Sequence, residues 1–106
     1  GLPGMTQMAN MLKDLDLTSE QWKEVRTSAQ KRLDKIGDLW AERMKLQIEL
    51  ASLDWDKEMD PQKVKSLFVK EAEAKAEMFL TSSDYLRKLR KVLTPDQLEK
   101  LRGYQW

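Results

Sequence analysis

The chain has 106 residues, a length that fits one domain with a modest hydrophobic core. Its 19 basic and 18 acidic residues leave a net charge of +1, which favours neither nucleic acid nor an anionic membrane surface as a partner. It contains no cysteine and no histidine, which excludes disulfides, thiolate metal sites and the commonest general base.

A short helix is expected over residues 5–15. Its methionines, Met5, Met8 and Met11, recur at every third position, a spacing that gathers thioethers on one side of a helix. Thioether sulfur suits soft ions such as Cu(I) and Ag(I), so these residues are candidate metal ligands. The alternative is that they fill the core of an amphipathic helix as flexible apolar side chains.

The stretch LTSEQ at 17–21 has the residues of a complete helix start. Thr18 can act as the N-cap, and Gln21 can return a hydrogen bond to the cap, which makes a capping box. Leu17 and Trp22 stand where a hydrophobic staple closes, and Glu20 favours the positive end of the helix dipole. We therefore expect a helix to begin at residue 19.

This helix is expected to run from 19 to about 53. Its apolar residues recur at steps of three and four and form one stripe: Trp22, Val25, Ala29, Leu33, Ile36, Trp40, Met44 and Ile48. A second set widens the stripe in the later half, so that the helix can contact more than one neighbour: Leu39, Leu46, Leu50 and Leu53.

The pattern stops in an acidic segment, residues 54–60, which we interpret as a solvated loop. Its alternating acids resemble a calcium loop, but the central glycine is missing and Lys65 stands where the bidentate glutamate belongs. Asp60 before Pro61 is a helix cap followed by proline at the first position, which predicts a second long helix over 61–91. Its expected buried side is Val64, Leu67, Phe68, Ala72, Ala76, Phe79, Leu86 and Leu89. A bend or break is expected at 81–84, where side chains compete for backbone hydrogen bonds.

The stretch LTPDQ at 93–97 repeats each feature of the first motif. Thr94 is the N-cap and Gln97 completes the capping box, with Leu93 and Leu98 as the staple and Pro95 at the first helical position. Loss of a threonine cap should cost about 1 kcal/mol of stability. A short C-terminal helix is therefore expected from residue 95.

Together these elements predict an all-α fold: one domain over residues 1–106, built as a long antiparallel helical hairpin with short N- and C-terminal helices. A hairpin has one seam, and these apolar stripes are wider than one neighbour can cover. The uncovered remainder indicates a homodimer or a binding face.

Two LTxxQ motifs that frame a long helical hairpin resemble the LTxxQ family of bacterial periplasmic proteins. That family includes Spy- and CpxP-like envelope-stress chaperones and ZraP- and CnrX-like heavy-metal resistance proteins. The likeness runs from Leu17 to Leu101 and includes the Asp-Pro pair before the second long helix. The motif residues carry across with a structural role: Leu17, Thr18, Gln21, Leu93, Thr94 and Gln97.

The resemblance implies export to the periplasm, with the signal peptide absent from this sequence, and a homodimer of antiparallel protomers. It also implies one of two roles. A chaperone of the family would hold unfolded clients on an apolar face with a basic fringe. A metal protein of the family would bind zinc, nickel, cobalt or copper and report it to a membrane-anchored signalling partner. The metal ligands do not carry across, because those branches rely on histidine and this sequence has none.

The candidate face for clients or a partner combines apolar anchors with basic residues at the margin: Trp40, Met44, Phe68, Met78 and Phe79 with Arg43, Lys45, Lys70 and Lys75. Apolar anchors supply contact energy, and long basic side chains add electrostatic capture. The alternative is that these aromatic residues belong to the hairpin core or to the dimer seam.

The sequence offers no catalytic constellation, since it has no glycine-rich phosphate loop and no nucleophile beside a base. We expect no enzyme activity, no required cofactor and, because no apolar run approaches roughly 20 residues, no membrane insertion. The first interpretation is a non-enzymatic protein that binds unfolded clients or a partner. The alternatives are a metal-binding sensor or resistance protein that uses methionine or carboxylate ligands, and a structural dimer without clients.

Overall fold

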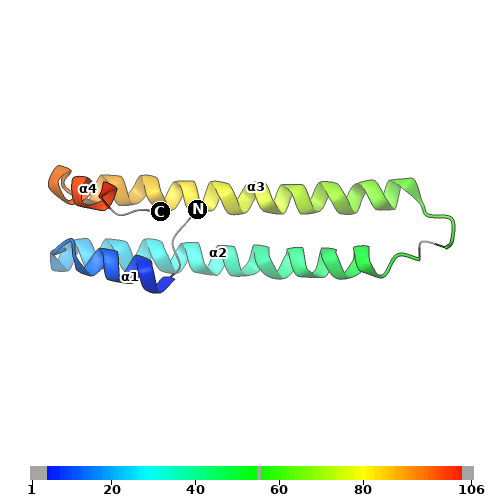
Figure 1. The fold of residues 1–106 in the computed structure, drawn as a ribbon, viewed down its shortest axis with the longest axis horizontal. Helices are drawn as coiled ribbons and strands as arrows, with labels where there is room; N and C mark the ends of the chain where they lie inside the picture. The colour runs from blue at the N-terminus through cyan, green and yellow to red at the C-terminus, as the bar shows by residue number, and fades with distance from the viewer. Residues whose placement is uncertain (1–4, 55, 104–106) are drawn as a thin grey trace. The chain divides into compact units, whose positions relative to one another are not determined.

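The computed structural model describes residues 5–54 and 56–103, most of which are helical. Figure 1 shows the four helices in chain order: α1 (Met5–Lys13), α2 (Ser19–Ala51), α3 (Pro61–Val92) and α4 (Pro95–Arg102). No strand occurs among the described residues, so the all-α prediction is confirmed. The complete hairpin, the homodimer and the single domain stay predictions.

The helix ends differ from the expected ones by one or two residues for local reasons. α1 stops at Lys13, and the following turn places Asp16 at a φ of 51°, a left-handed conformation that aspartate tolerates better than most residues. α2 stops at Ala51. The hydroxyl of Ser52 then donates to the carbonyl of Glu49 at 2.7 Å.

The break expected at 81–84 does not occur, because α3 is continuous from Pro61 to Val92. The hydroxyl of Thr81 donates to the carbonyl of Glu77 at 2.7 Å, in addition to the helical hydrogen bonds. Hydroxyl side chains at mid-helix therefore bond back to the preceding turn here and leave the helix intact.

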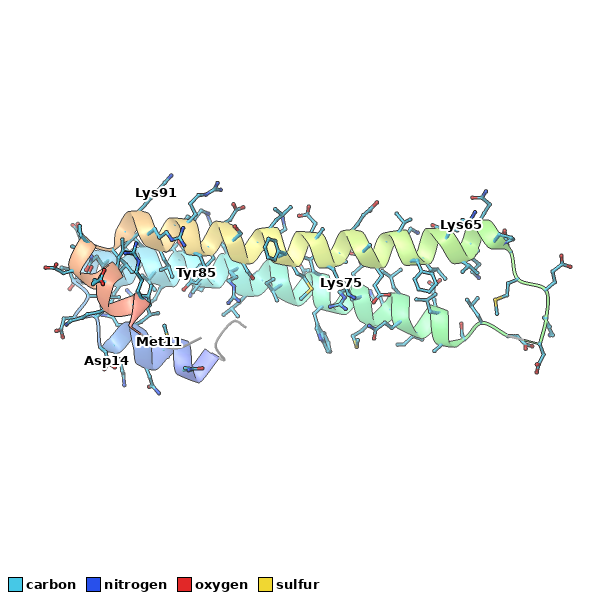
Figure 2. All side chains as sticks on the ribbon, turned by 45° about the horizontal axis from the view of Figure 1, so that its top comes forward. Met11, Asp14, Lys65, Lys75, Tyr85 and Lys91 are labelled. Atoms are coloured by element: carbon cyan, nitrogen blue, oxygen red, sulfur yellow. The ribbon has the colours of Figure 1, made fainter. Side chains whose placement is uncertain are left out.

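Two compact units make up the chain: unit 1 comprises residues 1–30 and 85–106, and unit 2 comprises residues 31–84. Unit 1 contains the main hydrophobic core, to which all four helices or their adjoining turns contribute. Its buried residues are Met11, Leu12, Leu15, Val25, Tyr85, Leu89, Leu93 and Leu101. Figure 2 labels two of them, Met11 on α1 and Tyr85 on α3.

In unit 2 the second half of α2 lies against the first part of α3 in antiparallel orientation. Lys35 forms an ion pair with Glu77 at 3.5 Å, whereas the later residue Arg43 pairs with the earlier Glu71 at 3.7 Å. Ten of the buried and half-buried residues recur at alternating steps of three and four, the repeat of a coiled-coil seam. We call them the seam: Ile36, Leu39, Arg43, Leu46 and Leu50 on α2, with Val64, Leu67, Glu71, Ala74 and Met78 on α3.

The expected buried side of the second helix is correct for Val64 and Leu67, which lie in the seam, and wrong for the other residues of unit 2. Phe68 and Phe79 are 58% and 75% exposed, and Ala72 and Ala76 are exposed as well. On α2 the widening set supplies three residues of the seam, Leu39, Leu46 and Leu50, while part of the first stripe faces outward: Leu33, Trp40 and Ile48. The physical reason is that two paired helices share only one narrow strip, and the residues at the 3.5-residue repeat form it.

Candidate functional site

The two LTxxQ motifs form capping boxes at the starts of α2 and α4. The backbone N–H of Gln21 donates to the Thr18 hydroxyl at 3.1 Å, and the Thr18 N–H donates to Gln21 Oε1 at 2.9 Å. The Thr94 and Gln97 pair repeats this arrangement at 3.2 and 2.9 Å. Both capping boxes expected from the sequence are therefore present, and each satisfies amide groups that a helix start leaves without partners.

The motifs also meet each other inside unit 1. Gln21 Nε2 donates to Gln97 Oε1 at 2.7 Å, and Gln97 Nε2 donates to Gln21 Oε1 at 3.1 Å. Each amide uses its second N–H on a helix end: Gln21 donates to the carbonyl of Val92 and Gln97 to that of Leu15, both at 3.1 Å. The two side chains thus fill all their donor and acceptor positions and connect the starts of α2 and α4 with the ends of α3 and α1.

The structure supports the structural role of the motif residues. Leu93 is buried in the core of unit 1, and Leu17, Trp22 and Leu98 pack against that core. The pairing of the two glutamines joins residues 76 positions apart, and no local pattern in the sequence predicted it. We call this arrangement of Gln21, Gln97 and their partners the glutamine pair.

The candidate face lies in unit 2, where one cation is partly enclosed within the seam. Arg43 donates from Nη1 to the sulfur of Met78 at 3.8 Å, and its Nη2 lies 3.7 Å from Glu71. Glu71 also accepts from Gln47 at 3.4 Å, and Arg43 Nε is buried without a hydrogen-bond partner. Arg43 and Met78 are therefore part of the helix pairing and do not form an open surface.

The contacts of Arg43 show the register in which the two helices meet. Glu71 and Met78 lie one turn before and one turn after Ala74, so Arg43 stands opposite this small, buried side chain. An alanine there leaves room for the arginine stem, which explains how a large cation fits between the helices.

Charged residues line one edge of the seam. Lys35 and Glu77, which form an ion pair, are both g positions of the heptad repeat in which the seam supplies a and d. Because the helices are antiparallel, one heptad forward on α2 and one heptad back on α3 place Glu42 across from Lys70. A further heptad places Glu49 across from Lys63. At each of these g positions an acid therefore stands across from a base, and Lys70 belongs to this charged edge.

The opposite edge is apolar. Because the helices are antiparallel, the e positions of both fall on the same edge, away from the g positions. Trp40, at an e position, is 57% exposed, and Phe68 is the corresponding residue of α3. We define the apolar edge by the e and b positions that carry it: Leu33, Gly37, Trp40 and Met44 on α2, with Phe68, Ala72, Lys75 and Phe79 on α3.

Five of the nine residues expected at the binding face are thus brought together on the apolar edge: Trp40, Met44, Phe68, Lys75 and Phe79. Lys75 lies on the side of α3 that is turned to α2 (Figure 2). Lys45 is exposed, but at a c position that belongs to neither edge. The alternative that Trp40 and Phe79 form the core of this helix pair is wrong, because both are exposed.

The methionine candidates are only partly described. Met11 is 1% exposed and lies in the core of unit 1, as the apolar interpretation predicts. The side chains of Met5 and Met8 lie outside the described residues. In the part of the chain that the structure describes, no cluster of three or more aspartate, glutamate, histidine or cysteine residues is placed to hold a metal ion.

Within residues 5–54 and 56–103 no helix is both long and apolar enough to cross a bilayer. Comparison with known proteins yields no matching family model, no matching curated protein and no matching solved structure.

Proposed function

We propose that this chain is a non-enzymatic helical binding protein of the periplasmic LTxxQ type, which holds apolar segments of unfolded proteins on the apolar edge of unit 2. Membership of that family is part of the proposal and rests on the two motifs and their helical frame. The homodimer is likewise proposed from the resemblance, and sedimentation of the purified chain measures it.

One observation carries the proposal: every exposed large apolar side chain of the described residues belongs to unit 2. They are Leu33, Trp40, Ile48, Phe68, Val69, Phe79 and Leu80, of which Leu33, Trp40, Phe68 and Phe79 lie on the apolar edge. Scattered surface apolar residues need no explanation, but a concentration on one part of a molecule marks an interaction surface. In unit 1, in contrast, the large apolar residues that the structure describes are buried in the core or packed against it.

The physical character of the edge suits tolerant binding. Aromatic side chains offer large contact areas at a low cost in side-chain entropy, and thioethers adapt to different shapes. Trp40 and Phe68 provide the first kind of contact and Met44 the second, and Lys75 adds a flexible cation. Such a surface binds by burial of apolar area and needs no fixed hydrogen-bond pattern.

The test is suppression of aggregation of a chemically unfolded client, followed by light scattering. The double variant Trp40→Ser and Phe79→Ser should lose most of the protection that the unchanged chain gives, because it removes two of the three exposed aromatic residues of the apolar edge. The matched control, Lys88→Ser with Lys91→Ser, changes two exposed residues of unit 1 and should keep it. Full protection by the double variant would refute the proposed surface.

A metal-binding role stays a prediction, and the same experiment distinguishes it from the chaperone-like role. Titration with Cu(I), Zn(II) and Ni(II) during the aggregation assay tests it directly. Tight metal binding by a chain that gives no protection would replace the chaperone-like function with the metal function.

A further inference from the structure

We infer that the apolar edge takes one amphipathic α-helix of another protein, with an acidic residue inside its apolar stripe. The inference rests on the proposed function, because it names the class of partner for the same surface. It follows from the shape of the edge and from its charge.

The shape indicates a missing third helix. A helix with a single neighbour needs apolar residues only at its a and d positions, whereas apolar e positions are typical of a helix with two neighbours. Leu33 and Trp40 on α2 and Phe68 on α3 occupy e positions on one and the same edge. Leu33 and Trp40 are seven residues apart, about 10 Å along the axis, which is the spacing of successive heptads of a docked helix.

The charge indicates that this helix carries an acid. The e and b positions of unit 2 from Leu33 to Gln47 and from Lys65 to Ser82 include two lysines, Lys65 and Lys75, and no acidic residue. Among the described residues neither lysine forms an ion pair. The opposite edge is charged but matched, acid against base, so the unmatched charge lies with the apolar surface.

The same charges argue against a second copy of this chain as the occupant. Lys75 lies near the middle of the edge, between Phe68 and Phe79. A two-fold axis through the middle of the edge brings Lys75 toward Lys75 of the partner copy, with no acid at the e and b positions to compensate. Like charges in a partly desolvated contact disfavour that arrangement.

Two synthetic peptides of three heptads, with the same leucine stripe and either Glu or Lys at its centre, test the inference. Fluorescence anisotropy measures their binding to the full chain. The unchanged chain should bind the Glu peptide about tenfold more tightly than the Lys peptide. Lys75→Glu should reverse this preference, and the control Lys91→Glu, an exposed lysine of unit 1 labelled in Figure 2, should retain it.

Equal binding of both peptides, or a preference that Lys75→Glu leaves unchanged, would overturn the acidic partner. Circular dichroism should show that the bound peptide gains helix, and a bound peptide without helix would overturn the helical form. A dimer that Trp40→Ser with Phe79→Ser converts to monomer would assign the edge to a second copy.

The proposed surface and the acidic helical partner can be refuted separately. If the double variant Trp40→Ser and Phe79→Ser weakens both peptides, the surface is correct whatever the charge preference. If it binds both peptides as tightly as the unchanged chain, the proposed function itself fails.

Discussion

Two glutamine side chains connect four helix ends in unit 1. Each accepts a hydrogen bond from its own threonine N–H, exchanges two with the other glutamine, and donates one to the carbonyl at Leu15 or Val92. Helix ends have backbone N–H and C=O groups without hydrogen-bond partners inside the helix. The side-chain amides of Gln21 and Gln97 provide partners for several of these groups. The repetition of the motif thus has a physical reason beyond two separate helix starts.

Gln97→Glu tests this role with almost no change in shape. The carboxylate cannot donate a hydrogen bond. It therefore repels the Leu15 carbonyl oxygen and Gln21 Oε1, the two acceptors to which Gln97 Nε2 donates. Loss of these bonds, with their acceptors left partly buried, should lower the free energy of unfolding by about 3 kcal/mol, as measured by urea denaturation. Gln30→Glu, at an exposed position of α2, is the control and should change it by less than about 0.5 kcal/mol.

At the scale of the element, polar residues inside the seam explain why the buried face of α3 was misassigned. Glu71 and Ala74 are seam positions, but one is charged and the other small. A prediction based on the number and size of apolar residues therefore favours the neighbouring face, because Phe68 and Phe79 are larger and more hydrophobic than Glu71 and Ala74. Arg43 hides the seam of α2 from the sequence pattern in the same way. A charged residue is expected at the surface unless its ion-pair partner, here Glu71, is known.

Gly37 provides a second test at this scale. It lies in the interior of α2, and a Cβ at this position would meet no atom within 4 Å beyond its neighbours and backbone in the same helix. Because alanine loses less backbone entropy than glycine on helix formation, Gly37→Ala should raise the free energy of unfolding by about 1 kcal/mol. The reverse change at the next turn, Ala41→Gly, should lower it by a similar amount, and both are measured by thermal or urea unfolding. A loss of stability in Gly37→Ala would contradict the exposed position of this glycine.

At the scale of the whole molecule, the two units differ in how much apolar surface they bury. Among the described residues the buried apolar side chains of unit 2 are Leu46, Leu67 and Ala74, whereas unit 1 has a core of eight. Local opening requires less free energy where fewer apolar contacts are broken. Unit 2 should therefore be the less protected part of the chain.

Hydrogen exchange measured by mass spectrometry checks this expectation. Backbone amides of residues 36–50 and 64–80 should exchange faster than those of residues 20–29 and 86–92, although all lie in α2 or α3. Uniform exchange along both helices would show that they open as single cooperative elements. Binding of an acidic amphipathic peptide should slow exchange in unit 2 first.

The sequence by itself determined the helices and their starts, because a capping box, a proline at the first helical position and an apolar periodicity act over only a few residues. The tertiary structure alone decided that Gln21 bonds to Gln97 and that Arg43 stands opposite Ala74. It also decided which apolar residues remain outside the seam. These outcomes depend on contacts between segments far apart in the chain, and local periodicity holds no information about the register in which two helices meet.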